Sequence, residues 1–183
     1  MFDRLNATKI LLILIWENTE NDPFFLNYLL KFFILLLTGG NKQVQKTLYD
    51  FFSSNPLCEK FFRKMNDLIF EEINYYNSMK KNELSSNKRN KILPKILRVL
   101  QLFCEGHNND LQNYLRFQNR SKNNYDMITI TVHLLLSFKV SDENYSTISQ
   151  CFDTLTEYVQ VNFKNKILFL NKYFIKILCN FYF

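Results

Sequence analysis

The sequence is poor in residues that make tight turns, because its 183 residues include only three Gly and three Pro. All-β sandwiches and Gly-rich nucleotide-binding folds need many more of both. Ala occurs once, whereas Asn occupies 23 positions and Phe 19. Hydrophobic residues make up 47% and charged residues 22%, so the chain can bury a core. This composition leaves long helices joined by polar loops as the expected architecture.

Residues that carry enzyme chemistry are also scarce. The two histidines are His107 and His133, and the sequence has no Gly-rich phosphate loop, H-E-x-x-H, EF-hand loop or G-x-S-x-G motif. A nucleophile without a positioned base does not support ordinary hydrolysis, so we do not expect an enzyme. Isolated cysteines among apolar neighbours predict buried thiols in a reducing compartment rather than a disulfide framework. They are Cys58, Cys104, Cys151 and Cys179.

The net charge of +6 is mild and spread along the chain. Its densest run is KKNELSSNKRNK, residues 80–91, which lacks apolar periodicity and is typical of an exposed basic linker. Such a run also occurs in nucleic-acid and lipid-binding patches, but we favour the linker. The apolar runs Ile10–Trp16 and Phe24–Leu37 fall short of the ~18 uninterrupted apolar residues of a spanning helix. We therefore expect buried helices and no membrane span.

Helix-capping residues divide the chain into seven or eight helices. Asp22-Pro23 and Asn55-Pro56 each combine an N-cap with a proline at the first helical position. Glycines at 39, 40 and 106 are suited to helix ends. Residues 128–132 alternate as a strand does, but they lie between helix-forming segments. The predicted helices run from Asn6 or Thr8 to Trp16, from Pro23 to Thr38, from Asn41 to the next cap, from Pro56 to Met79, from Pro94 to Gly106, from Asp110 onwards, and over 126–139 and 144–160.

This number of helices favours an all-α fold of stacked antiparallel helical hairpins, an incomplete armadillo-like solenoid. No clean internal sequence repeat is visible. The expected organisation is a helical solenoid segment over 1–80, a basic polar linker over 81–91, a helical domain over 92–160 and an apolar tail over 161–183.

Two polar segments interrupt the apolar helices. Cys104–Asp110, CEGHNND, gathers oxygen and nitrogen donors at one helix end. In Leu155–Gln160, LTEYVQ, Glu157 and Gln160 are three residues apart and so share a helix face. Taken alone, the first pattern is also compatible with a cap and loop, and the second with a solvated stripe.

Residues 96–118, ILRVLQLF followed by CEGHNND and LQNYLRFQ, resemble the RIH-associated domain of the inositol trisphosphate receptor and ryanodine receptor family of intracellular calcium-release channels. LTEYVQ matches that domain at about the expected distance. Upstream, GGNKQVQK (39–46) and EKFF (59–62) are similar to the stretch that precedes it. The resemblance covers roughly residues 39–160 and is greatest to the inositol trisphosphate receptor branch.

The resemblance implies a cytoplasmic coupling segment between a ligand-sensing head and a pore that this chain lacks. Its partners would be other domains and subunits of a tetrameric channel on the cytoplasmic face of the endoplasmic reticulum or a similar calcium store. The resemblance also implies that Glu105 and Glu157 are acidic ligands of an activating calcium site, supported by His107 and Gln160. A further ligand would come from beyond the pore, so we expect weak calcium binding by this chain, at about 10⁻⁴–10⁻³ M.

Past Gln160 the chain departs from the family pattern, which continues into a Gly-Pro-Cys turn. Residues 161–183 have two interpretations. One is a read-through intron, since Val161-Asn162 is compatible with a splice-donor-like codon string. The other is an amphipathic helix that closes the solenoid, with an apolar stripe of Ile167, Leu170, Phe174 and Leu178.

Two other functions remain open for the whole chain. The first is a stand-alone helical protein–protein interaction module, or a non-functional fragment. The second is a basic nucleic-acid binder, whose affinity would fall steeply with salt.

Overall fold

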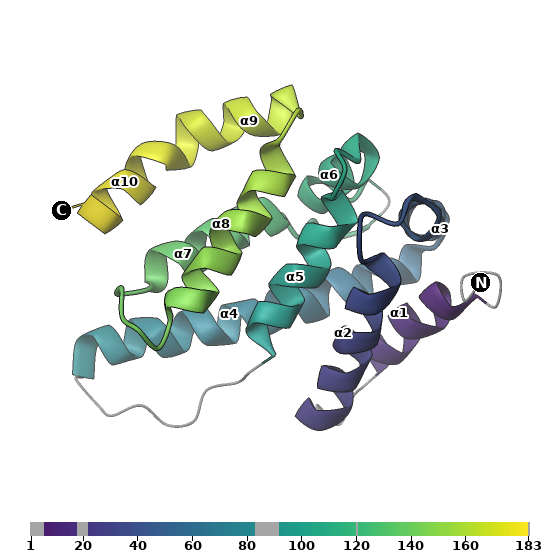
Figure 1. Ribbon diagram of the computed structural model, residues 1–183, viewed down its shortest axis with the longest axis horizontal. Helices are drawn as coiled ribbons and strands as arrows, with labels where there is room; N and C mark the ends of the chain where they lie inside the picture. Colours follow the sequence, from purple (N-terminus) through teal and green to yellow (C-terminus); the bar gives the residue numbers. More distant parts are fainter. Residues whose placement is uncertain (1–5, 18–21, 83–91, 120, 183) are drawn as a thin grey trace.

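A computed structural model describes residues 6–17, 22–82, 92–119 and 121–182. Every regular element in these ranges is helical (Figure 1), which confirms the all-α prediction. The α-helices are α1 (Ala7–Glu17), α2 (Pro23–Leu37), α3 (Lys42–Ser54), α4 (Glu59–Asn82), α5 (Leu93–Cys104), α6 (Asn109–Arg116), α7 (Met127–Ser137), α8 (Tyr145–Val159), α9 (Phe163–Phe169) and α10 (Ile175–Tyr182). A 3₁₀ turn, η2 (Pro56–Cys58), precedes α4, and a π-helical turn, η3 (Leu170–Phe174), joins α9 to α10. Most of the expected basic linker, 83–91, lies outside the described residues.

Most helix boundaries follow the predicted caps. The side chain of Asp22 accepts hydrogen bonds from the first N–H groups of α2, and Asn41 does the same for α3. Residues 39–40 have the positive φ angles, 74° and 64°, that glycine supplies at a helix end. The predicted cap at Asp110 is wrong, because α6 begins one residue earlier and Asn108 caps it. The alternating residues 128–132 belong to α7.

The helix contacts repeat with a period of three. Helix α4 packs against α1 and α7, α5 packs against α2 and α8, and α6 contacts α3 and α9. Helices α1–α3, α4–α6 and α7–α9 therefore make three units, and equivalent helices of successive units lie side by side (Figure 1). Within each unit the middle helix contacts both of its chain neighbours.

An aromatic cluster fills the core where the first two units meet. The ring centroid of Phe52 lies 5.0 Å from that of Phe62, 5.6 Å from that of Tyr114 and 5.8 Å from that of Phe103. All four side chains are buried. Stacked and edge-to-face pairs of this kind add about 0.5–1.5 kcal/mol each beyond the burial of their area. The cluster ties α3, α4, α5 and α6 together.

The segment that follows α8 folds back over α7 and α8. The hydroxyl of Tyr173 lies 2.7 Å from Thr129 Oγ1 on α7, and its ring is buried. The fully buried Asn165 side chain donates hydrogen bonds to the backbone oxygens of Gln112 and Tyr158. Among the covered positions, 165, 169, 173, 177 and 181 form a row spaced by four residues, and Asn162 and Leu168 are covered beside it.

The predicted apolar stripe of this segment is wrong. Ile167, Leu170, Phe174 and Leu178 are all at least 38% exposed. Four residues of an α-helix turn through about 400°, so a row spaced by four drifts by about 40° per step. The wider π turn offsets this drift and keeps the row on the covered face. A sequence pattern that assumes 3.6 residues per turn throughout misses such a change.

Three of the cysteines are buried as expected, but Cys179 on α10 is exposed. All four are free thiols. Burial raises the pKa of Cys58 to about 12 and also raises the pKa of Cys104 and of Cys151. The thiolate is the nucleophilic form, so these three thiols are poor nucleophiles.

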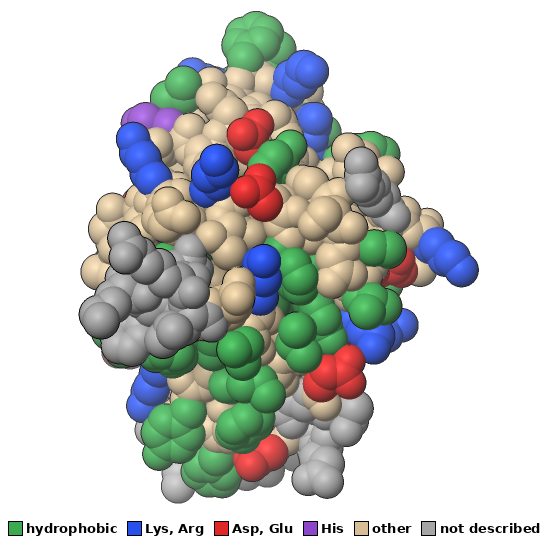
Figure 2. Space-filling model, turned by 90° about the vertical axis from the view of Figure 1, so that its right-hand side faces the viewer, with side chains coloured by type: hydrophobic (Ala, Val, Ile, Leu, Met, Phe, Trp, Pro, Cys, Tyr) green, Lys and Arg blue, Asp and Glu red, His purple; other side chains and the backbone are tan. Residues whose placement is uncertain are grey.

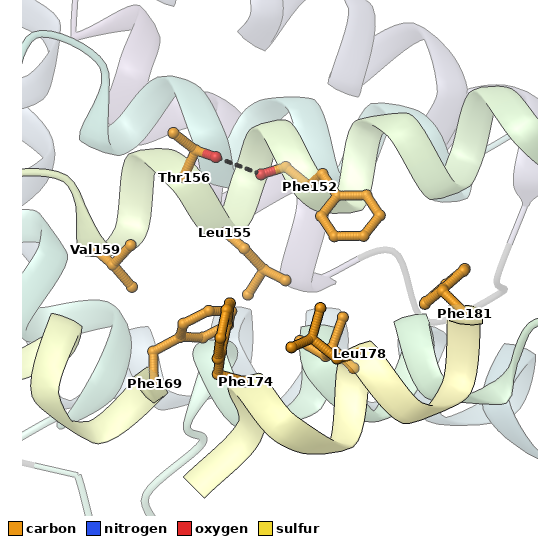
Figure 3. A pocket seen from close by; sticks show the side chains of 9 residues that line it. Phe152, Leu155, Thr156, Val159, Phe169, Phe174, Leu178 and Phe181 are labelled. Carbon is orange, nitrogen blue, oxygen red and sulfur yellow. Dashed lines mark hydrogen bonds between the residues drawn. The ribbon is translucent and has the colours of Figure 1, made fainter. Parts of the chain in front are cut away.

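A cavity of about 310 Å³ lies between α8 and the α9–α10 segment (Figure 3). Phe169 and Phe174 are five residues apart, yet both line it because η3 widens the helix between them. The hydroxyl of Thr156, the polar side-chain group in the lining, donates to the backbone oxygen of Phe152 at 2.9 Å. The cavity is therefore an apolar space without side-chain groups for catalysis or metal binding.

Candidate cation site at two helix ends

The two acidic residues singled out in the sequence lie at the carboxyl ends of neighbouring helices. Glu105 is the C-cap residue of α5, and Glu157 is in the last turn of α8. These helices pack against each other and end on the same side of the molecule (Figure 1). Residues 52 positions apart in the sequence are thus brought together, since the charge of Glu105 acts on the carboxyl group of Glu157.

The electrostatics of the pair disfavour two negative charges. Burial raises the pKa of Glu157 above its ordinary value, and the negative charge of Glu105 raises it further. His107 and Arg98 act in the opposite direction. The carboxyl ends of helices add partial negative charge to the same region. This end of the molecule therefore favours a cation.

Each carboxylate also has a buried oxygen that accepts no hydrogen bond. These atoms are Glu105 Oε2 and Glu157 Oε2. The Arg98 guanidinium lies 3.7 Å from Glu105 Oε2, an ion-pair distance that is too long for a hydrogen bond. Sequence reasoning missed Arg98, which lies on α5 seven residues, or about two helical turns, before Glu105.

A buried glutamine on α3 fixes the backbone at Glu105. Gln45 Nε2 donates to the backbone oxygens of Leu102 and Glu105, at 3.0 and 2.8 Å. Asn108 Nδ2 in turn donates to Gln45 Oε1 at 3.2 Å. Gly40 approaches the same backbone so closely that a Cβ there would lie 3.1 Å from the Glu105 oxygen. These contacts hold the end of α5 in one position.

A second buried glutamine plays the same part at Glu157. Gln112 Nε2 on α6 donates to the backbone oxygens of Glu157 and Gln160, at 2.7 and 3.0 Å. These carbonyls are at the end of α8, where no further turn of helix supplies a donor. The sequence could have indicated that both glutamines are buried and hydrogen-bonded, because each lies on the apolar face of its helix. Gln45 is three residues before Leu48, and Gln112 is three residues before Leu115.

The two predicted supporting residues, His107 and Gln160, are related to the acid pair in different ways. His107 is exposed, has a positive φ of 65°, and is close enough to Glu157 to lower its pKa. Gln160 is also exposed, and its backbone oxygen accepts a hydrogen bond from the Gln112 side chain, which also binds the backbone of Glu157. The charges of Glu105 and His107 therefore both act on the carboxyl group of Glu157. Gln160 is the C-cap residue of the helix that carries Glu157.

The donors suit a hard divalent cation in kind but are too few for a complete site. Calcium takes about six to eight oxygen ligands at roughly 2.3–2.6 Å. Within the described ranges, no cluster of three or more His, Cys, Asp or Glu side chains is close enough to hold a metal ion. Two carboxylates, each with one buried oxygen that accepts no hydrogen bond, are fewer ligands than such a shell needs.

Comparison with known proteins identifies the family. Residues 87–182 match the family model described as RyR and IP3R Homology associated, which refers to the ryanodine and inositol trisphosphate receptors. The chain belongs to this family. The match spans α5 to α10, so it includes both glutamates and most of the segment after Gln160. The family resemblance read from the sequence is confirmed, and the family description names receptors and no enzyme.

A relative of the chain is the inositol 1,4,5-trisphosphate receptor of Caenorhabditis elegans. The two are 38% identical over an alignment of 77 positions, and the match covers 36% of this chain and 3% of the receptor. The chain therefore matches only a small part of that receptor's length. No single described helix is long and apolar enough to cross a membrane. Helices α2 and α3 together meet the criterion of length and composition, with a bend of 120° between them.

Proposed function

We propose that this chain is a cytoplasmic regulatory and coupling segment of an intracellular ligand-gated calcium-release channel. Membership of the RIH-associated family and the similarity to an inositol trisphosphate receptor support this function. The partners would be other domains and subunits of the channel, at the cytoplasmic face of the endoplasmic reticulum or a similar calcium store.

The proposal includes a calcium site to which Glu105 and Glu157 contribute acidic ligands. The observation that carries it is the carboxylate pair at two helix ends, with one buried oxygen on each side chain that accepts no hydrogen bond. Calcium would supply the positive charge that offsets the mutual repulsion of the pair. Gln45 hydrogen-bonds the backbone of Glu105 and Gln112 that of Glu157, and His107 acts on Glu157 from the loop after α5.

An incomplete ligand set gives the pair a role in coupling. Glu105 and Glu157 leave most of a calcium coordination shell to be filled from elsewhere. A ligand from another channel domain would complete the shell only when that domain lies against this helix end. The two acids would then bind calcium more tightly in one arrangement of the channel than in another, which is the condition for gating by a ligand.

We also propose that the three units stack as an incomplete armadillo-like solenoid. The contacts between equivalent helices of successive units support this arrangement. Hydrophobic side chains gather on the face formed by the N-terminal helices (Figure 2), where a preceding unit would pack. Examples on α2 are Phe24, Tyr28 and Leu35, each at least 66% exposed.

Helix α9 packs on α8 as the third helix of its unit, and α10 packs on α7, where the first helix of a following unit would pack. We propose that the α9–α10 segment is a genuine closing element rather than a read-through intron. The buried hydrogen bonds of Asn165 and Tyr173 support this interpretation, because a translated intron has no reason to place polar groups opposite matching partners.

Isothermal titration of the chain with calcium chloride tests the calcium assignment. The expected dissociation constant is about 10⁻⁴–10⁻³ M, and Glu105→Gln combined with Glu157→Gln should weaken binding by tenfold or more. A matched control is Asp142→Asn with Glu143→Gln, two exposed acids in the loop before α8, which should leave binding unchanged. Sub-micromolar binding would show that the site is complete within this chain. Equal binding by the Gln variant and the control would remove the two acids from the site.

A further inference from the structure

The α9–α10 segment carries charge of one sign. Residues 161–183 contain four lysines and no Asp, Glu or Arg, so they account for four of the six net positive charges of the chain. All four lysines are exposed. They are Lys164, Lys166, Lys172 and Lys176. Lys172 Nζ lies 5.0 Å from the ring centroid of Tyr173, and the charge of Asp126 also acts on this lysine.

Large apolar side chains of the same segment are exposed as well. Phe163 is 73% exposed and Ile175 is 71% exposed. Leu170 is 44% exposed between them. A helix face that stays in water is usually polar. An outer face with this composition favours a partner that accepts both positive charge and apolar surface.

We propose that this outer face docks on an anionic membrane surface. A helix that lies in a membrane interface combines exposed Phe, Leu or Ile side chains with lysines whose charged ends stay at the headgroups. The segment has this composition over 163–182, a length of about 30 Å at 1.5 Å per residue. Helices α9 and α10 lie along the edge of the molecule away from α1–α3 (Figure 1), so a flat surface can approach them.

Two features favour a bilayer over a nucleic acid as the anionic partner. Arginine, whose planar group binds phosphate in a bidentate manner, is absent from the segment. The exposed Phe163, Leu170 and Ile175 gain nothing from a phosphate backbone, whereas an interface of lipid headgroups and acyl chains can bury them. The proposal does not depend on the calcium pair, which involves different residues.

Sedimentation with vesicles tests the proposal. The chain should bind phosphatidylcholine vesicles containing 30% phosphatidylserine in 50 mM salt, and should bind pure phosphatidylcholine vesicles poorly. Each lysine near an anionic surface contributes roughly fivefold to partitioning at low salt. Replacing the four lysines of the segment by glutamine should therefore reduce binding by about 100-fold or more, and 500 mM salt should do the same.

A charge-matched control separates this face from the net charge of the chain. Exposed lysines on α2, α3 and the loop after α7 can be replaced by glutamine with the same loss of four charges. They are Lys31, Lys42, Lys46 and Lys139. This variant should keep binding within about threefold of the wild type. An apolar pair, Phe163→Ser with Ile175→Ser, should reduce binding, whereas Phe24→Ser with Leu35→Ser on α2 should not.

The exposed thiol of Cys179 gives a second readout that needs no destabilising variant. The other three cysteines are buried, so an environment-sensitive fluorophore should label Cys179 selectively. Anionic vesicles should increase its emission and shift it to the blue as α10 enters the interface. Unchanged emission, equal loss of binding in the two lysine variants, or release of the protein from vesicles by a single-stranded oligonucleotide would overturn the proposal.

Discussion

Replacing Gln112 by methionine should destabilise the chain by about 2–3 kcal/mol. Gln112 is fully buried, and its Nε2 donates to two carbonyl oxygens at the end of α8. Methionine keeps the length of the side chain but donates no hydrogen bond, so both carbonyls lose their partner at about 1–3 kcal/mol each. Part of this cost is offset, because the variant also removes Gln112 Oε1, a buried acceptor without a partner.

Thermal unfolding followed by circular dichroism measures the effect. A loss of 2–3 kcal/mol lowers Tm by about 4–12 °C for a chain of this size. The matched control is Gln43→Met, which makes the same chemical change at an exposed position of α3 and should shift Tm by less than 1 °C. A shift of less than 1 °C for Gln112→Met as well would refute the view that this side chain holds the end of α8.

Three further outcomes follow from the electrostatics of the acid pair, the close approach at Gly40 and the aromatic core. Glu157→Gln should stabilise the chain by about 0.3–1 kcal/mol at pH 7. Folding raises the pKa of Glu157, so the wild-type protein becomes more stable relative to the variant as the pH falls toward 4.5. The difference between their urea unfolding midpoints should therefore be smaller at pH 4.5 than at pH 7. Gly40→Ala should cost about 1–3 kcal/mol, since the Cβ at φ +64° meets the Glu105 backbone, and chemical denaturation measures the loss. Phe52→Ala should cost about 3–5 kcal/mol in the same assay, and a value below 1 kcal/mol would place Phe52 outside the core.

Local chemistry made most of the helices predictable. The caps at Asp22 and Asn41 act through one or two neighbouring N–H groups, so the sequence around them was sufficient. Asp110 misled the prediction because Asn108, two residues earlier, is an equally good cap. The stacking of units could not be read from a repeat, because equivalent helices share positions in space without sharing a sequence pattern.

The site was accessible from the sequence only in part. The family resemblance drew attention to Glu105 and Glu157, whereas their meeting depends on the packing of α5 against α8. Gln45, Gln112 and Arg98 escaped notice because their partners are backbone atoms or side chains that only tertiary structure identifies.

The course of the segment after α8 was missed for a different reason. Its covered face follows a spacing of four residues through a π turn, whereas the predicted stripe assumed a regular α-helix. Hydrophobic periodicity identifies the buried face of a regular α-helix. It cannot locate a single π turn in a helix that carries apolar side chains on both its buried and its exposed face.

The most direct test of the proposed calcium site is the pKa of Glu157, measured from its side-chain carboxyl carbon by NMR with and without calcium. Without calcium the pKa should lie above the ordinary value of 4.5, and Glu105→Gln should lower it. Millimolar calcium should also lower it, because a bound cation favours the ionised form. A Glu157 that titrates near 4.5 and does not respond to calcium would contradict the assignment of these two acids to a cation site.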